Sequence, residues 1–279
     1  MRNIFKSFFV LILLVVTTSP SHAADEVFNR VMKTKTINCG YFIWPTNIQK
    51  DANTGKLSGM NYDAMEAMGK TLGLKINWAM EVNPGEINAA LNANKIDVMC
   101  ATMWPSPARF SDTTFTSRVE FYSLMFPIVR SDDHRFDKGL AAVNNKSIKV
   151  TGIEGDVTSD VAVEKLPNST KAFLGASASP AEMLMQITTK KADVLFIDRG
   201  AVNEFSKTNP DVLKVVDQNG PVRVFGEHIM VKLGEHNLRN ILDMAMLQLT
   251  NDGYFEELTK KYAKEFNTTI YAPSKDFVK

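Results

Sequence analysis

The 279-residue sequence has little of what metal, redox and nucleic-acid chemistry requires. It contains two cysteines and four histidines, and these follow no metal-ligand spacing. Its 32 Lys and Arg side chains are nearly balanced by 31 Asp and Glu side chains. The sequence therefore lacks the excess of positive charge that would predict binding to nucleic acid or anionic lipid. We therefore expect no metal, no cofactor and no nucleic-acid partner.

Long apolar runs are also missing, apart from one near the N-terminus. Residues 8–16 are all apolar, Arg2 and Lys6 precede them, and Ser-His-Ala follows at residues 21–23. The run is shorter than the ~20 residues of a membrane span. The pattern is typical of a secretory signal peptide cleaved after residue 23, and the alternative is an uncleaved anchor. We predict a leader at residues 1–23 and a periplasmic location.

Removing 23 of the 279 residues leaves 256, enough for one large or two modest domains. The leader takes away two cations, so the mature chain carries one more acidic than basic side chain. Cys39 and Cys100 both lie in apolar, strand-like segments of the same half. An oxidising compartment permits a disulfide between them. The alternative is two small buried hydrophobic side chains.

Strand-like and helix-like patterns alternate along the chain. Strand patterns cover residues 36–41, 76–80, 96–103, 147–153 and 192–197, and helical patterns cover 62–72, 87–91, 157–166, 180–187, 238–249 and 255–262. This alternation predicts mainly parallel sheets flanked by helices. The polar residues 267–279 are expected to trail along the surface.

One helix–strand unit occurs twice. Residues 86–98 and 182–194 each begin with Glu and run into a strand through Lys-x-Asp-Val. This favours two similar lobes, and the alternative is coincidence between two generic amphipathic helices. Asp97 and Asp193 precede their strands, so we expect turn or capping residues rather than ligands.

Parallel sheets bind ligands beyond the carboxyl ends of their strands, and Arg109 and Asp198 follow such ends. A guanidinium can bind a carboxylate through two parallel hydrogen bonds, although an Arg in a Pro-rich loop is usually only solvated. Asp198 could accept hydrogen bonds from an ammonium group or could cap the following helix. Thr102 corresponds to Asp198 in the first half of the chain.

Aromatic residues gather near the same strand ends, at Tyr41, Phe42, Trp44 and Trp104. They could wall an apolar slot or stack on a cation. The alternative is packing between the lobes, which we prefer for Phe42.

Several motifs occur in order along the chain. They are Gly-Tyr at 40–41 with Gly-Lys-Leu-Ser-Gly-Met-Asn-Tyr-Asp at 55–63, Ala-Thr-Met at 101–103 followed by Arg109, Ile-Glu-Gly-Asp-Val-Thr at 153–158, Lys-Ala-Asp-Val at 191–194 followed by Asp198, and Asn-Asp-Gly-Tyr at 251–254. Together they resemble the bacterial family 3 extracellular solute-binding proteins, the type II periplasmic receptors of polar amino-acid ABC transporters. The resemblance spans nearly the whole mature chain.

The resemblance implies a type II periplasmic-binding-protein-like clamp of two α/β lobes joined by two crossover strands. Lobe 1 is expected at residues 24–119 and again at 226–267, lobe 2 with the hinge strands at 120–225, and a tail at 268–279. It also implies a monomer that captures a small polar amino acid, or a related amine or carboxylate, by lobe closure. The ligand would then pass to an inner-membrane ABC permease.

The resemblance also implies roles for single residues. Arg109 would bind the ligand carboxylate, helped by backbone near Thr102 and by the loop at Gly155. Asp198 would bind the amino group. Trp44 falls where the family places an aromatic residue that stacks on the ligand side chain.

Four residues depart from the family pattern. Trp104 stands where many members carry a small hydroxyl residue. Asp156 replaces the hydroxyl residue after Gly155, and its charge would repel a carboxylate unless it turns away. Pro84 replaces an aromatic residue, and Tyr41 replaces a residue that is acidic in some members. These changes could suit a more cationic or less carboxylate-dependent ligand.

Two alternatives to a transport receptor stay open. The same scaffold hosts periplasmic dehydratases, and an enzyme would need a positioned acid or base. Glu154 and Asp156 are the nearest candidates, but no His or Lys accompanies them by motif, so we predict no enzymatic activity. The other alternative is a ligand-sensing partner of a membrane receptor.

Overall fold

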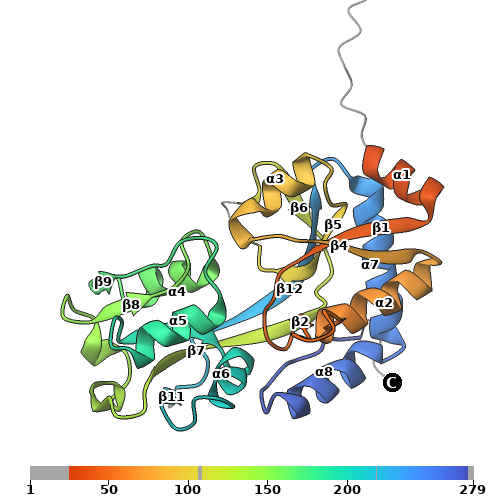
Figure 1. The fold of residues 1–279 in the computed structure, drawn as a ribbon. Helices are drawn as coiled ribbons and strands as arrows, with labels where there is room; N and C mark the ends of the chain where they lie inside the picture. Colours follow the sequence, from red (N-terminus) through yellow and green to blue (C-terminus); the bar gives the residue numbers. More distant parts are fainter. Residues whose placement is uncertain (1–24, 106–108, 218, 276–279) are drawn as a thin grey trace, which may run out of the picture.

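The structure is a computed structural model that describes residues 25–105, 109–217 and 219–275. The predicted leader at residues 1–23 lies outside this part of the chain. Figure 1 shows two lobes joined through two long strands, β7 (Phe121–Arg130) and β12 (Arg223–Lys232). The predicted two-lobed α/β fold is therefore confirmed. Across the described residues, no helix combines the length and apolar character needed to span a membrane.

The first lobe is built on three parallel strands in the order β4 (Lys75–Glu81), β1 (Thr36–Tyr41) and β5 (Val98–Met103). β12 enters this sheet antiparallel to β5 and also pairs with β6 (Thr113–Phe115). All six residues of β5 are buried, which explains its apolar sequence. The remaining elements are α1 (Glu26–Thr34), β2 (Gln49–Lys50), β3 (Leu57–Ser58), α2 (Met60–Leu72), η1 (Pro84–Glu86), α3 (Ile87–Asn92), α7 (His236–Asn251) and α8 (Tyr254–Glu265).

The second lobe repeats this plan. Its parallel strands are β9 (Thr170–Lys171), β8 (Lys149–Thr151) and β10 (Val194–Asp198), and β7 runs antiparallel to β10. β11 (Leu213–Val215) pairs with the outer part of β7. The remaining elements are η3 (His134–Phe136), η4 (Ala141–Val143), α4 (Val157–Lys165), α5 (Pro180–Thr188) and α6 (Arg199–Ser206).

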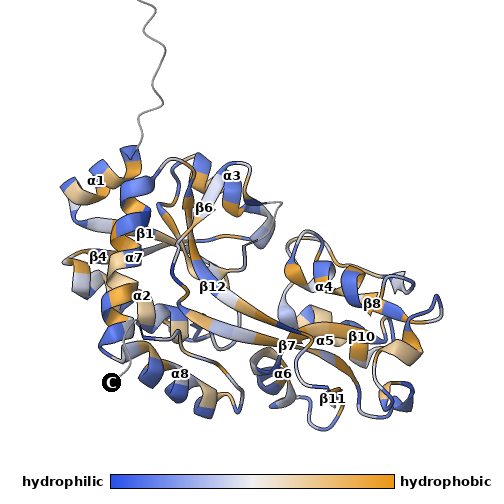
Figure 2. Ribbon diagram, turned by 180° about the vertical axis from the view of Figure 1, so that it is seen from behind, coloured by the Kyte–Doolittle hydropathy of each residue, from blue (hydrophilic) through white to orange (hydrophobic). Residues whose placement is uncertain are grey.

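The two crossing strands make the sheets of both lobes continuous. β7 pairs with β12 over residues 121–125 and with β10 over residues 125–129. β12 leaves β7 after residue 227 and pairs with β5 from residue 228. Figure 2 shows β7 and β10 as largely hydrophobic, whereas several helices carry hydrophilic and hydrophobic stripes. Each lobe therefore has its own core beside a shared pair of strands.

The repeated helix–strand unit makes the same contacts in both lobes. The backbone N–H of Asp97 donates to Asn38 O at 2.8 Å, and the Asp97 carboxylate accepts from Asn38 N at 2.6 Å. Asp193 makes the same pair of bonds with Lys149, at 2.7 and 2.8 Å. Both aspartates thus fasten a turn to a neighbouring strand, as predicted, which supports two similar lobes over coincidence.

Local signals in the sequence also set helix ends. Ser179 and Glu182 form the predicted capping box at the start of α5, with Pro180 in the first turn. α2 stops at Gly73, whose φ of 65° is in the left-handed region that glycine adopts easily.

The segment after α8 contains no buried residue over 267–275, in line with the predicted surface location, but it is also tied to β7 and α6. Tyr271 forms a β-bridge with Tyr122 of β7, with N–H···O distances of 2.8 and 3.2 Å. Asn203 of α6 donates to the carbonyls of Phe266 and Asn267. Backbone groups along β7 otherwise need partners, and the tail supplies them. Polar composition alone does not reveal such pairing.

Cys39 of β1 and Cys100 of β5 form a disulfide between adjacent parallel strands, and both residues are fully buried. Of the two alternatives that the sequence left open, the structure shows the bridge.

Reducing this disulfide should lower the free energy of unfolding by about 2–4 kcal/mol, because the bridge restricts the unfolded chain across a sequence separation of 61. Urea denaturation followed by tryptophan fluorescence, with and without dithiothreitol, measures this. The double variant Cys39→Ala/Cys100→Ala is the control, since reductant should leave its midpoint unchanged. An unchanged wild-type midpoint, with both thiols titrated as free, would contradict a stabilising bridge.

Candidate functional site

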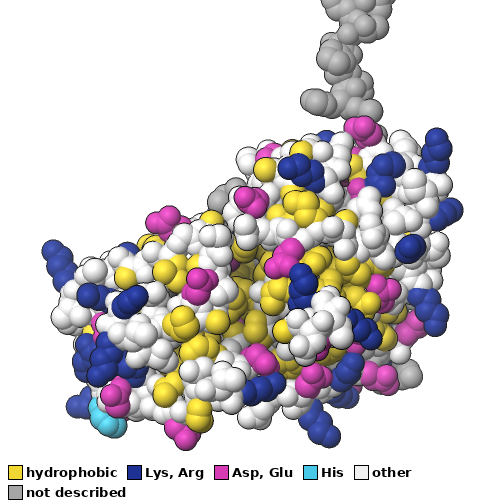
Figure 3. Space-filling model, in the orientation of Figure 1, with side chains coloured by type: hydrophobic (Ala, Val, Ile, Leu, Met, Phe, Trp, Pro, Cys, Tyr) yellow, Lys and Arg dark blue, Asp and Glu magenta, His cyan; other side chains and the backbone are white. Residues whose placement is uncertain are grey.

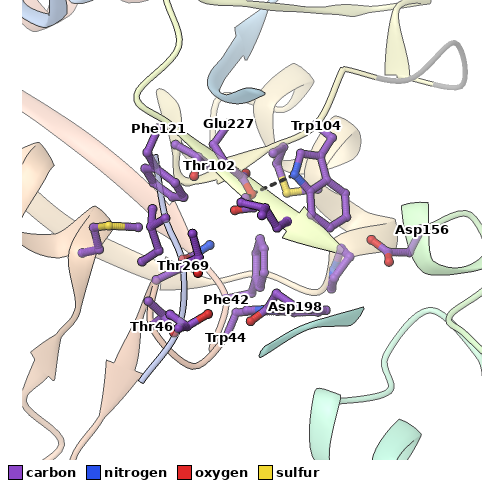
Figure 4. Close-up of a pocket in the computed structure, with 18 residues that line it drawn as sticks. Phe42, Trp44, Thr46, Thr102, Trp104, Phe121, Asp156, Asp198, Glu227 and Thr269 are labelled. Carbon is purple, nitrogen blue, oxygen red and sulfur yellow. Dashed lines mark hydrogen bonds between the residues drawn. The ribbon is translucent and has the colours of Figure 1, made fainter. Parts of the chain in front are cut away.

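A pocket lies between the two lobes beside the crossing strands. The space that water-sized molecules can occupy in it is ≈ 40 Å³, within ≈ 640 Å³ that also counts space open to solvent. Figure 3 shows hydrophobic side chains gathered in the recess between the lobes, and Figure 4 shows the pocket itself. Its lining consists of Phe42, Trp44, Thr46, Asn47, Met60, Pro84, Thr102, Met103, Trp104, Phe121, Ser123, Leu124, Asp156, Asp198, Glu227, Thr268, Thr269 and Ile270.

Asp198 is the last residue of β10 and lines the pocket from the second lobe. Its Oδ2 accepts a hydrogen bond of 2.8 Å from Trp44 Nε1, and its Oδ1 accepts one of 2.9 Å from the backbone N–H of Ala201. Asp198 therefore caps α6 and faces the pocket at the same time. Burial raises the pKa of Asp198 against the opposing effect of these hydrogen bonds. Because Trp44 belongs to the first lobe, its bond to Asp198 joins the two lobes at one side of the pocket.

Close packing accompanies this bond. Trp44 is 8% exposed and packs with apolar residues of the second lobe, among them Ile153 and Met183. Gly200, in the first turn of α6, lies so close to Thr46 that a Cβ there would overlap Thr46 Oγ1. The two lobes are thus in contact on this side of the pocket.

Glu227 of β12 is a pocket residue that the sequence reasoning missed. Its Oε1 accepts hydrogen bonds of 2.7 Å from both Trp104 Nε1 and Ser123 Oγ (Figure 4 draws the first). Burial raises the pKa of Glu227 to about 8, and the negative charge of Asp198 adds to the shift. The sequence did offer one signal for Glu227, because a charged residue two positions before the apolar run at residues 229–231 of a strand is unusual.

A second buried glutamate lies behind the pocket wall. Glu120 is fully buried and accepts a 2.9 Å hydrogen bond from Asn61 Nδ2, which also donates to Thr102 Oγ1 at 3.0 Å. Burial raises the pKa of Glu120 to about 8, and the charge of Glu227 adds to it. Thr102 is therefore held between this buried network and the pocket.

Arg109 is buried, with 6% of its surface exposed, but is not among the described lining residues. Its Nη1 lies 3.5 Å from the carbonyl oxygen of Trp104. Burial lowers the pKa of Arg109, and the negative charges of Asp156 and Asp160 oppose this. The guanidinium thus adjoins the pocket edge and interacts with the start of α4. Its role in binding a carboxylate stays a prediction.

Asp156 lines the pocket and caps α4. Its Oδ1 accepts hydrogen bonds from Thr158 N at 3.0 Å and Thr158 Oγ1 at 2.8 Å. Gly155, with a φ of 72°, makes the turn that precedes it. In Figure 4 the Asp156 carboxylate points toward the pocket. The charge that the sequence placed next to Gly155 is therefore part of the pocket wall.

The aromatic candidates separate into two groups. Phe42, Trp44 and Trp104 line the pocket, and Trp104 stacks on Phe225 with ring centroids 4.3 Å apart. Phe42 also packs edge-on against Trp44 at 6.2 Å, so it combines lining with the expected packing role. Tyr41 instead packs in the core of the first lobe and is not among the described lining residues.

The free energy of unfolding should fall as pH rises from 5 to 8. Glu227 holds its proton up to about pH 8 when folded but has an ordinary value of 4.5, so between these values the folded state binds more protons. Each such group contributes up to about 1.4 kcal/mol per pH unit. Glu227→Gln keeps an acceptor for Trp104 and should flatten the dependence in part, since Glu120 remains.

Urea denaturation of both proteins at several pH values measures this. The surface variant Glu204→Gln, which removes only the carboxylate paired with Lys207, is the control and should keep the wild-type slope. Equal slopes for wild type and Glu227→Gln would contradict the assignment of a raised pKa to Glu227.

Comparison with known proteins agrees with this architecture. A probable amino-acid ABC transporter-binding protein of Haemophilus influenzae is 32% identical over 114 residues, 41% of this chain and 43% of that protein. A membrane-bound lytic murein transglycosylase F of Cronobacter sakazakii is 20% identical over 97% of this chain and 52% of its own length. The chain thus matches about half the length of these two relatives.

A solved structure, the ancestral amino acid-binding protein AncCDT-1, described as a precursor of cyclohexadienyl dehydratase, superposes with a TM-score of 0.71. It is 22% identical and the match covers 84% of this chain and 97% of that one, which shows a shared fold. Residues 41–265 match the family of bacterial extracellular solute-binding proteins, family 3. The chain belongs to that family.

Proposed function

We propose that the protein is the periplasmic substrate-binding protein of an ABC transporter. It captures a small amino acid, or a related amine or carboxylate, by lobe closure and delivers it to an inner-membrane permease. The observation that carries this proposal is a pocket between two lobes, at which Trp44 of one lobe donates a hydrogen bond to Asp198 of the other. The family of the chain and the predicted leader at residues 1–23 support it.

Closure follows from the division of the pocket between the lobes. Trp44 and Thr102 come from the first lobe, whereas Asp156 and Asp198 come from the second. A ligand that touches both sides stabilises the closed arrangement more than the open one. Water leaves the space between the lobes on closure, which strengthens every electrostatic contact with the ligand.

Individual roles follow from the positions of these side chains. Asp198 binds an amino group, and the ring of Trp44 packs against the body of the ligand. For a ligand that carries a carboxylate, Arg109 and backbone near Thr102 and Gly155 are the proposed partners. Arg109→Ala would then weaken binding of that ligand sharply.

A second candidate function is a dehydratase-like enzyme, and one observation favours it. Glu227 is a buried acid whose pKa of about 8 keeps it protonated at neutral pH, as a general acid requires. Glu154, the acid considered from sequence, is not among the described lining residues. Turnover of hydroxy acids by the purified protein, lost in Glu227→Gln, supports this function, and no turnover argues against it.

A thermal-shift screen of amino acids, amines and small carboxylates tests the receptor proposal. At least one compound should raise the melting temperature, because a ligand at 100 times its Kd stabilises the folded state by ≈ 2.7 kcal/mol. Asp198→Asn keeps an oxygen acceptor for Trp44 but loses the charge, and should weaken an amine-bearing ligand at least 10-fold. Glu204→Gln should bind it as wild type does. Failure of all three compound classes would contradict the proposal.

A further inference from the structure

The described lining of the pocket contains acidic side chains and no basic ones. Its lining includes the carboxylates of Asp156, Asp198 and Glu227, and no Lys, Arg or His occurs among the described lining residues. Buried carboxylates in proteins are normally paired with a cation or bound to a metal. The described residues contain no cluster that could hold a metal ion. The described lining therefore contains no positive group, and a ligand could supply one.

The hydrogen bonds to Glu227 and Asp198 come from neutral donors. Glu227 accepts from the indole of Trp104 and the hydroxyl of Ser123. Asp198 likewise accepts from an indole, that of Trp44, and from backbone N–H groups. Neutral donors satisfy hydrogen-bonding capacity but do not cancel the charge of an ionised carboxylate.

Aromatic rings complete a wall suited to a cation. Phe42, Trp44, Trp104 and Phe121 all line the pocket, and Figure 4 shows these rings around its centre together with Asp198 and Glu227. The faces of aromatic rings attract organic cations. Thr46 Oγ1, also in the lining, is buried without a hydrogen-bond partner among the described residues and can accept one from an N–H group.

The groups suited to a carboxylate already lie near acidic side chains. The N–H of Thr158 in the first turn of α4 donates to Asp156 Oδ1. Arg109, the nearest guanidinium, is attracted by Asp156 and Asp160. A carboxylate brought to this end of the pocket would meet the charge of Asp156, and like charges held close together repel each other.

We propose, on the basis of the solute-binding function above, that the pocket takes a small organic amine that carries no carboxylate, and that Glu227 with Asp198 supplies the charge that selects it. Glu227 is thus a specificity-determining residue. An amino acid would place its carboxylate against Asp156, whereas the corresponding amine leaves that space empty.

The ionisation of Glu227 is compatible with this role. In the empty pocket, burial and the charge of Asp198 raise its pKa, and Glu120 faces it from the chain preceding β7. A bound ammonium group favours the ionised carboxylate and lowers that pKa again. Binding is therefore accompanied by release of a proton from Glu227.

Matched pairs of an amino acid and its decarboxylated amine test the proposal. The probes are histamine and histidine, agmatine and arginine, tyramine and tyrosine, and cadaverine and lysine, each titrated calorimetrically into the full mature protein. At least one amine should bind 10-fold or more tightly than its amino acid. Tighter or equal binding of the amino acid in every pair that binds would overturn the proposal.

Two variants locate the source of the selectivity. Glu227→Gln removes the charge but keeps the oxygen acceptor, and should weaken the amine at least 10-fold. Asp156→Thr restores a hydroxyl residue, and should move the ratio of amine to amino-acid affinity at least 10-fold toward the amino acid. Glu204→Gln should keep the wild-type ratio. Unchanged affinities in both variants would overturn the proposal, and the Asp156 variant decides it alone if Glu227→Gln does not fold.

The outcomes also separate this proposal from the function on which it rests. If the broader screen yields an amino acid or carboxylate ligand while all four amines fail, the amine proposal is wrong and the receptor proposal stands. If no compound of any class binds, both are wrong.

Discussion

The hydrogen bond between the Trp44 indole and the Asp198 carboxylate ties the two halves of the molecule together at the pocket. It joins a loop after one parallel sheet to the end of a strand in the other. The indole ring packs among apolar residues of the opposite lobe, so breaking the bond on opening also exposes that ring. Under the proposed function, closure of the lobes would therefore form this contact and the pocket together, and a ligand would contribute to the same step.

Placing carboxyl groups in and beside the pocket costs desolvation free energy. Glu227 and Glu120 are buried and Asp198 is half-buried, and desolvation raises the pKa of each. Neutral donors hold these carboxylates in place, whereas a surrounding cation would stabilise them before any ligand arrives. A site that leaves this charge unmatched is less stable when empty and gains more on binding a cation. This gives a physical reason for the carboxyl groups of Glu120 and Glu227, which lie on or next to the two crossing strands among apolar residues.

The sequence predicts the fold well because its signals are local. The first strand at residues 36–41, the capping box at residues 179–182 and the paired Lys-x-Asp-Val turns each depend on neighbouring residues, and the structure contains all three. Glu227 could not be placed in this way, since its donor Trp104 lies 123 positions away and belongs to no motif with it. The burial of Arg109 beside Asp156 likewise depends on how two lobes meet, which local patterns do not encode.

The distance between the lobes is the most direct test of closure through Trp44 and Asp198. Spin labels on introduced cysteines at Lys70 of α2 and Val163 of α4, both exposed, report this distance by pulsed electron paramagnetic resonance. With a ligand from the screen bound, the account predicts one narrow, short distance in wild type and a broader, longer distribution in Trp44→Phe, which lacks the indole N–H that Asp198 accepts from. The same distribution in both proteins, with and without ligand, would contradict it.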